Sequence, residues 1–332
     1  MYLQHFGLER NPFSLTPDPR FLFLTAKHRE ALAALLFGIT QRKGLLVITG
    51  GAGTGKTTLI RKLLVALPAT SAQFSVVINP ALTRSELLEY VLMDFGMKEV
   101  PSSKARRLSM FSDLLNEASR SGRFTVLIVD EAHLLGAELI EEIRLLSNFE
   151  TTEQKLLQIV LAGQTELNNV LNLESMTQVK QRIAIRMHLD PLSQKEVDRY
   201  LQTRWERGGA REPLPFGTDA IEVITRFSGG VPRVINSICD AALVNAYGTG
   251  VKEIASKDIL EVIADLQLAS ADQSGATASP LPNVRSPAKA PGSMLPNLTT
   301  FTTLNKYMPG EPKARKRSRL ANWFRFARAG VE

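Results

Sequence analysis

Residues 50–57, Gly-Gly-Ala-Gly-Thr-Gly-Lys-Thr, form a glycine-rich stretch between an apolar run and a helical pattern. Glycine lets the backbone wrap closely around a phosphate chain, so that successive amide groups and the start of the next helix point at its oxygens. In this motif the lysine reaches the β- and γ-phosphates of ATP, and the hydroxyl that follows binds Mg²⁺. The alternative is a strand-to-helix turn without a ligand. We therefore expect a nucleotide-binding loop made of Gly50, Gly51, Ala52, Gly53, Thr54, Gly55, Lys56, Thr57 and Thr58.

A pair of carboxylates closes a second apolar run, Phe124–Asp130 followed by Glu131. On a strand beside the phosphate loop, Asp130 would join Thr57 at the metal, through water. Glu131 would then orient and deprotonate the attacking water. The alternative reading is that the two acids cap a following helix, Leu134–Ser147. His133 is expected to be a residue of that helix start or a polar neighbour of the site.

Three further polar residues follow elements that could bring them to the same site. Gln164 ends the apolar run Leu156–Ala162 and could hydrogen-bond the γ-phosphate or the water; otherwise it is a strand cap. Arg182 could reach the γ-phosphate of a neighbouring subunit as an arginine finger, with Arg186 as its competitor. Arg233, in the first turn of a helix, could contact the phosphates, so that the position of this helix depends on the bound nucleotide. Otherwise it is a solvated side chain.

The elements that must position these residues alternate between short apolar runs and helical patterns, which is typical of a parallel sheet covered on both faces. After Pro191 only helical segments appear. Two of the predicted helices begin with capping boxes, Thr83–Glu86 and Ser193–Glu196. The predicted strands are Gly44–Thr49, Gln73–Asn79, Phe124–Asp130, Leu156–Ala162 and Ile185–Leu189, and the predicted later helices are 194–207, 219–227, 232–247 and 256–266.

The net charge of +7 belongs to one end of the chain. Residues 269–332 hold ten of the 40 Lys and Arg and three of the 33 Asp and Glu, which leaves 30 of each sign in residues 1–268. Seven prolines in the same stretch predict a linker without a packed core. Within Lys313–Ala329, Leu320, Trp323, Phe324 and Ala327 fall on one helical face among seven cations. Such a segment could bind an anionic membrane, bind nucleic acid, or remain a solvated end.

Together these motifs resemble those of the AAA+ ATPases, over nearly all of residues 1–268. The opening Tyr2–Leu8, Asn11–Phe13 and Thr16–Phe23, together with Ala162–Gln164, resemble the general secretion pathway protein A (ExeA-like) group, which is related to transposition ATPases of the TniB/TnsC kind. The resemblance implies a P-loop NTPase with a five-stranded parallel sheet and a small all-helical lid domain. The composition of residues 269–332 predicts that a disordered tail follows. The resemblance also implies ATP with Mg²⁺, bound at subunit boundaries of a homo-oligomer, a hexameric ring. The Phe- and Pro-rich N-terminal segment is implied to lie near the adenine.

The function that follows is an ATP hydrolase coupling ATP binding and hydrolysis to assembly or regulation of a secretion, pilus or polysaccharide-export machinery. Its partner would be a protein of that system. Two alternatives stay open: a DNA-associated regulator of transposition, which a neutral body disfavours, and a nucleotide-switched adaptor. Many members of the group continue from the lid into a membrane-spanning helix and a peptidoglycan-binding domain. This sequence resembles them only in the ATPase part, so the resemblance does not imply a role in cell-wall remodelling.

These expectations divide the chain into five parts and place it in the cytoplasm, where membrane binding by the tail would make it peripheral on the inner face of the cytoplasmic membrane. The parts are an N-terminal strap with the first ATPase helix (1–43), the AAA+ α/β domain (44–192), the helical lid (193–268), a Pro-rich linker (269–312) and a basic amphipathic tail (313–332).

Overall fold

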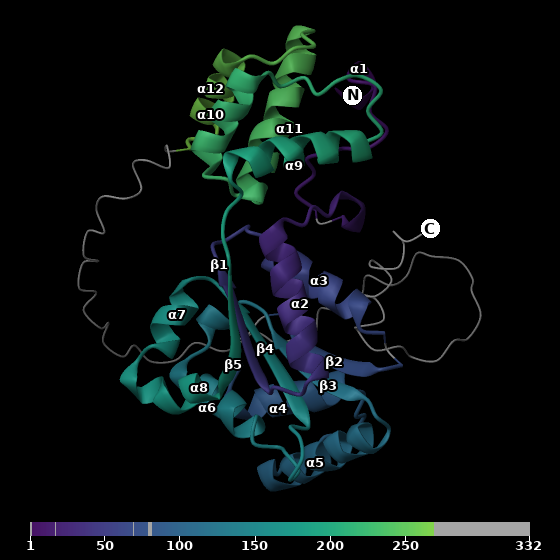
Figure 1. The fold of residues 1–332 in the computed structure, drawn as a ribbon, viewed down its shortest axis with the longest axis vertical. Coiled ribbons are helices and arrows are strands. Elements are labelled where there is room, and N and C mark those ends of the chain that lie inside the picture. The colour runs from purple at the N-terminus through teal and green to yellow at the C-terminus, as the bar shows by residue number, and fades with distance from the viewer. Residues whose placement is uncertain (1, 17, 69, 79–81, 269–332) are drawn as a thin grey trace, which may run out of the picture.

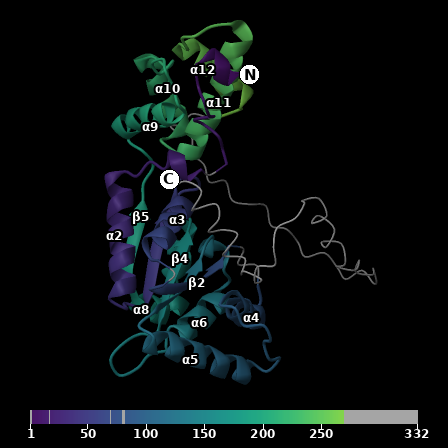
Figure 2. The same ribbon diagram turned by 90° about the vertical axis from the view of Figure 1, so that its right-hand side faces the viewer.

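The computed structural model describes residues 2–16, 18–68, 70–78 and 82–268. These residues form an α/β body and a helical body that stands over one end of the sheet (Figures 1 and 2). The expected linker (269–312) and basic tail (313–332) lie outside the described residues.

A single five-stranded parallel sheet forms the centre of the α/β body, in the order β2-β3-β4-β1-β5. The prediction of five parallel strands is confirmed, and the predicted bounds differ from the observed ones by no more than two residues. β4 lies between β1, which leads into the phosphate loop, and β3, which leads into the acidic pair. The strands are β1 (Leu45–Gly50), β2 (Ala72–Val77), β3 (Phe124–Val129), β4 (Leu157–Gly163) and β5 (Ile183–Leu189).

Helices cover both faces of this sheet because its central strands are apolar on both sides. Leu46 and Ile48 of β1 belong to the core under α2 (Ala26–Thr40) and α3 (Lys56–Ala66). Leu45 and Val47 belong to the opposite core, since successive side chains of a strand point to opposite faces. That second core is covered by α4 (Arg84–Asp94), α5 (Lys104–Arg120), α6 (Ala137–Leu146), α7 (Glu166–Leu171) and α8 (Thr177–Arg182).

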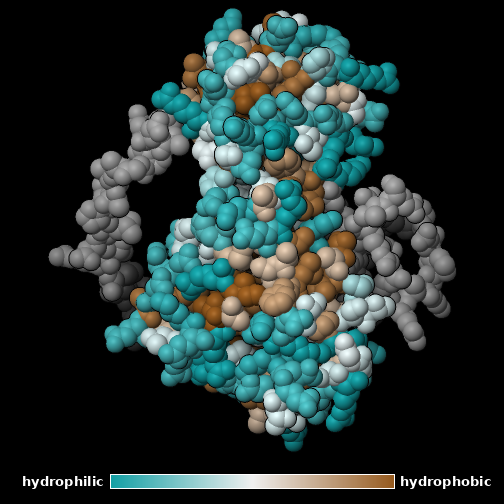
Figure 3. Space-filling view, viewed as in Figure 1, coloured by the Kyte–Doolittle hydropathy of each residue, from teal (hydrophilic) through white to brown (hydrophobic). Residues whose placement is uncertain are grey.

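Edge strand β5 differs from the central strands, because its side chains alternate between partly buried and exposed. Arg186 and His188 are on the exposed side. Charged and polar groups on an edge discourage pairing with another strand. Figure 3 shows a largely hydrophilic surface on this side of the molecule, with apolar side chains gathered in a band across the α/β body.

The helical body contains the four predicted helices, α9 (Gln194–Arg207), α10 (Thr218–Ser228), α11 (Pro232–Thr249) and α12 (Ser256–Asp265). Both predicted capping boxes are present. At each helix start a glutamate side chain accepts a hydrogen bond from the backbone amide of the capping residue. Glu86 accepts a hydrogen bond from the Thr83 amide at 2.7 Å, and Glu196 accepts one from the Ser193 amide at 3.0 Å. The second contact fixes where the lid begins, just after the chain leaves the sheet.

The N-terminal segment packs against the lid. Phe6, Leu8 and Phe13 are buried in the lid core, and the ring of Phe13 contacts that of Phe216 edge-on. Complete burial of one such ring stabilises a fold by roughly 1.5–3 kcal/mol. The guanidinium of Arg204 in α9 donates to the Pro12 carbonyl. Residues that precede the sheet in sequence therefore form part of the hydrophobic core of the lid.

The expected first part of the chain, residues 1–43, is thus divided between two cores. Phe23 packs with the lid core, whereas Leu24 packs with the core under α2. Arg207 of α9 donates to the Leu22 carbonyl at 2.7 Å, which holds this boundary against the lid. We call residues 2–16 and 18–23 together with the lid helices the strap–lid body.

The predicted helix Leu134–Ser147 is wrong at its start. A 3₁₀ turn covers Ala132–Leu134, and α6 begins only at Ala137. Leu135 between them is extended, with ψ of 129°, and its side chain is buried in the sheet core. Burial of Leu135 therefore interrupts the helix, and Gly136 provides the new helix start.

Candidate nucleotide-binding site

The phosphate loop runs from the end of β1 to the start of α3, as its sequence predicts. Gly53 and Gly55 have φ of 76° and 101°, values that other residues rarely adopt. Consecutive residues in such a turn direct their amide groups into one concave surface, which binds anions. The backbone at this edge of the sheet is therefore shaped for phosphate.

Lys56 lies across this loop and is 6% exposed. Its Nζ donates to the carbonyl oxygens of Gly50 and Gly51, both at 2.9 Å. Burial lowers the pKa of the Lys56 amine, and the nearby carboxylates of Glu131 and Asp130 act in the opposite direction. The amine is thus held at the loop, facing the acidic pair across the space that a phosphate chain would enter.

Thr57 and Asp130 form a pair of oxygen donors beside the loop. The Thr57 hydroxyl donates to Asp130 Oδ2 at 2.9 Å, and Asp130 is 6% exposed. Hydroxyl and carboxylate oxygens are the ligands that hard divalent cations prefer, and nucleotide sites commonly use one or two of them with the phosphates completing the shell. Within the described ranges, no group of three or more His, Cys, Asp or Glu side chains could hold a metal by itself. The donor set therefore fits a cation that arrives with phosphates.

Glu131 has a strained backbone, since its φ of 52° places a residue other than glycine in the left-handed region. Its side chain is 42% exposed, yet its Oε2 atom is buried and accepts no hydrogen bond from the described residues. His133 Nδ1 lies 3.4 Å from this oxygen and donates no hydrogen bond to it. One carboxylate oxygen of Glu131 therefore has hydrogen-bonding capacity that the described residues do not use.

Gln164 follows β4, the strand between those of the phosphate loop and the acidic pair. Its backbone amide donates to His133 Nδ1 at 3.4 Å. The 3₁₀ turn after the acidic pair thus meets the end of β4. His133 is a polar neighbour of Glu131 and Gln164, one of the two alternatives that the sequence left open. Gln164 lies at the correct edge of the sheet for a phosphate or water contact, and its role stays a prediction.

Arg233 is brought to the loop by the lid. A Cβ atom placed on Gly53 would lie 2.9 Å from Arg233 Cβ and 3.0 Å from Val231 Cγ1. The start of α11 therefore packs directly on the phosphate loop, and only glycine fits at this contact.

Arg182 lies at the other end of the sheet. It ends α8 just before Ile183, which pairs with Leu45 at the start of β1. Glu150 is close enough for the Arg182 charge to lower the pKa of its carboxyl group, after the larger effect of Lys155. Arg186 lies mid-strand, opposite Val47. Neither arginine belongs to the cluster around the loop of its own chain.

His28 is a contact of the loop that the sequence did not indicate. It is 5% exposed, and its Nε2 lies 3.0 Å from the Thr54 carbonyl oxygen. Its Nδ1 lies 2.8 Å from Oγ1 of Thr25, the residue that caps α2. A single histidine in an apolar helix pattern gives no signal of such a contact; only the fold reveals it.

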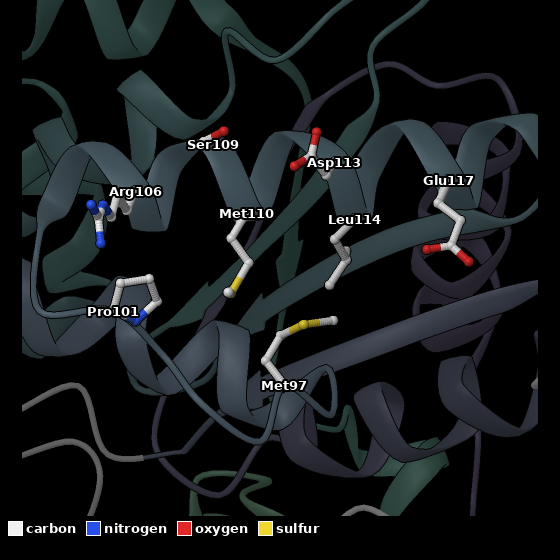
Figure 4. Close-up of a pocket in the computed structure, with 8 residues that line it drawn as sticks. All are labelled: Met97, Pro101, Arg106, Ser109, Met110, Asp113, Leu114 and Glu117. Carbon is white, nitrogen blue, oxygen red and sulfur yellow. The ribbon is translucent and has the colours of Figure 1, made fainter.

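A depression of about 450 Å³ between α5 and the loop that precedes it lies apart from these residues (Figure 4). Its walls include Met97, Met110 and Leu114, with Arg106 and Asp113 beside them. None of the residues of the predicted site lines it, so the nucleotide site remains the one at the sheet edge.

Comparison with known proteins agrees with this geometry. The AAA domain family matches residues 39–171. General secretion pathway protein A of Aeromonas hydrophila is 41% identical over 263 residues, which is 78% of this chain and 47% of that protein. The chain belongs to the AAA+ ATPases. Its predicted resemblance to the general secretion pathway protein A group is confirmed by this identity.

More distant matches are a relative found by sequence and two solved structures with a similar fold. The ATP-dependent target DNA activator B of Escherichia phage Mu is 24% identical over 239 residues, 70% of each chain. The solved structure of the ORC2 protein of Aeropyrum pernix, in ADPNP–ADP complexes, has a TM-score of 0.58 and 16% identity, covering 78% of this chain and 72% of that one. The RuvB branch migration motor of Thermotoga maritima has a TM-score of 0.50 and 19% identity, covering 74% and 70%.

The chain spans about half the length of the curated secretion relative that it matches. The matched 263 residues nevertheless exceed the α/β body, so the similarity extends into the strap–lid body.

We predict that Lys56→Ala and Glu131→Gln separate binding from turnover. Lys56→Ala should lose nucleotide binding, because no other described cation spans the loop in this way. Glu131→Gln should bind ATP within about threefold of the unchanged protein but hydrolyse it about 100-fold more slowly or worse, since an amide cannot accept a proton. A fluorescent ATP analogue measures binding, and phosphate release measures turnover.

Glu138→Gln is the matched control, because this glutamate of α6 is 79% exposed and its loss should leave both quantities unchanged. Normal hydrolysis by Glu131→Gln would show that another group activates the water.

Proposed function

We propose that this AAA+ ATPase couples ATP binding and hydrolysis to the assembly or regulation of a secretion, pilus or polysaccharide-export machinery. The identity with general secretion pathway protein A carries the proposal, because it extends through a region longer than the nucleotide-binding body. Similarity confined to the phosphate loop and acidic pair would support ATP chemistry alone. Similarity that includes the strap–lid body also supports a shared way of coupling ATP hydrolysis to movement of the lid.

In the proposed mechanism, the loop amides and Lys56 hold the phosphates of ATP. Thr57 and Asp130 would hold Mg²⁺, which screens phosphate charge when it is bound. Glu131 orients the attacking water and accepts its proton on its partly exposed carboxylate. Gln164, at the end of the intervening strand, hydrogen-bonds the γ-phosphate or this water. Arg233 contacts the phosphates from the lid.

We propose that Arg182 acts on a neighbouring copy of the chain in a homo-oligomer, with a hexameric ring as the expected form. Six residues of β1 separate the two ends of the sheet, roughly 20 Å at about 3.3 Å per residue. That distance exceeds the reach of an arginine side chain, so Arg182 cannot serve the loop of its own chain. A head-to-tail contact between copies would place it at the next loop.

A DNA-associated regulator of transposition is the second candidate, favoured by the similarity to the phage Mu protein. Lys104, Arg106 and Arg107 form a local cluster of cations that could serve such a role, and two of the three are engaged within the protein. Lys104 pairs with Glu142 at 2.8 Å, and Arg107 pairs with Glu89 at 2.8 Å. These pairs tie α5 to α6 and α4, which weighs against a DNA-binding surface there.

A nucleotide-switched adaptor without hydrolysis is the third candidate. The unsatisfied oxygen of Glu131 beside the phosphate site supports hydrolysis instead, because an adaptor has no need of a strained, unpaired carboxylate.

The proposed location is cytoplasmic, with residues 313–332 holding the protein at the inner face of the cytoplasmic membrane. Among the described residues, no helix combines the length and the hydropathy that crossing a membrane requires. The seven cations and the apolar stripe of the tail support binding to anionic headgroups, each cation contributing about 1 kcal/mol near the surface.

Mixing experiments test the proposed role of Arg182. Arg182→Ala and Lys56→Ala should each be inactive alone, yet a mixture should regain hydrolysis, because the first supplies an intact loop and the second an intact arginine. Arg186→Ala is the matched control and should remain active. Phosphate release from the mixtures gives the measurement. A mixture that stays inactive while its subunits co-assemble would indicate that Arg182 has only a local structural role.

Co-sedimentation distinguishes the first two candidate functions. With ATP present, the full chain should sediment with anionic vesicles, and a chain lacking residues 269–332 should not, while both hydrolyse ATP at similar rates. Neutral vesicles control for charge, and duplex DNA is the competing ligand. Sedimentation with DNA that survives removal of the tail would favour the transposition regulator instead.

A further inference from the structure

His28 connects the phosphate loop to the helix that precedes it. The hydroxyl of Thr25 and the carbonyl of Thr54 lie on opposite sides of its ring, at 2.8 Å and 3.0 Å from its two nitrogens. The same ring lies against Gly55, where an added Cβ would be 3.0 Å from Nε2. The side chain thus fills the space directly behind the loop.

These partners determine which nitrogen of His28 carries the proton. The Thr54 carbonyl only accepts hydrogen bonds, so Nε2 must donate. Nδ1 is then the acceptor and receives the Thr25 hydroxyl, whose oxygen accepts in turn from the His28 amide at 3.2 Å. Burial holds the pKa of His28 below its ordinary value, against the smaller effects of the Thr54 hydrogen bond and the Glu196 charge. The ring is therefore a neutral and fully partnered donor.

Holding the Thr54 carbonyl also fixes the amide on the other side of the same peptide bond. The peptide unit is planar and trans, so its carbonyl and its N–H point in opposite directions. With the Thr54 oxygen directed out to His28, the Gly55 N–H is directed away from His28. That is the side on which the loop encloses a phosphate.

The strap–lid body reaches His28 through a short connection. Arg207 of α9 holds the Leu22 carbonyl, and three residues later Thr25 caps α2 and contacts the ring. Glu196, in the first turn of α9, is near enough to act on the charge of the ring. A shift of α9 therefore displaces the segment that positions His28.

We infer that His28 is a positioning residue, which orients the Thr54–Gly55 peptide for phosphate binding and links it to the strap–lid body. The inference rests on nucleotide binding at the proposed site.

The test compares two His28 variants in the full chain, with mant-ADP as the probe and tripolyphosphate as competitor. His28→Ala removes the donor and should weaken both ligands about tenfold, the effect of one hydrogen bond that orients a phosphate contact. His28→Gln retains an N–H donor of similar reach and should stay within about threefold of the unchanged protein.

Leu32→Ala is the matched control, one turn further along α2 and partly buried against the same core. It loosens the helix without touching the loop, so its affinities should stay within about twofold of the unchanged protein. Melting temperatures of all variants show whether each is folded at the assay temperature.

Three results would overturn the inference: unchanged affinity in His28→Ala, equal losses in His28→Ala and His28→Gln, or an equal loss in Leu32→Ala. An unchanged protein that binds neither mant-ADP nor tripolyphosphate would overturn the nucleotide-binding assignment itself, and the inference with it.

Discussion

A loop that binds phosphate through its backbone must turn amide groups inward, and its carbonyl groups then need partners on the outside. In this protein His28 takes the carbonyl of Thr54 behind the loop, and Lys56 takes those of Gly50 and Gly51 on the side that faces the acidic pair. The start of α11 packs on Gly53. The conformation of eight residues therefore depends on α3, which continues the loop, on α2, which precedes it, and on the lid, which is distant in sequence.

This dependence explains why two bodies meet at the loop. The chain crosses between them twice, between Phe23 and Leu24 and again between Leu189 and Leu192, and both crossings lie at the same end of the sheet (Figure 1). The Leu192 amide donates to the Gly230 carbonyl at 2.8 Å, which fixes the start of α11 beside the second crossing. A change at the phosphates can thus reach the lid by two routes.

Much of the fold and of the phosphate loop could be predicted from short stretches of the sequence. Glycine spacing with a lysine identifies the loop, and apolar runs identify the five strands, because each signal lies within a few consecutive residues. Packing between distant segments was not predictable. Phe13 is equally apolar whichever core it joins, Leu135 interrupts a helix only because the core accepts it, and His28 resembles any histidine in a helix. The proposed target of Arg182 is a neighbouring copy of the chain, whose position the sequence of one chain does not indicate.

Hydrogen exchange of backbone amides, with and without ADP, tests most directly the claim that the loop joins the two bodies. The account predicts protection at residues 50–57 and, in the same experiment, changed exchange in residues 2–16 and at the start of α11, with α5 unchanged as the internal control. Protection confined to residues 50–57, with the strap–lid body exchanging as before, would contradict it.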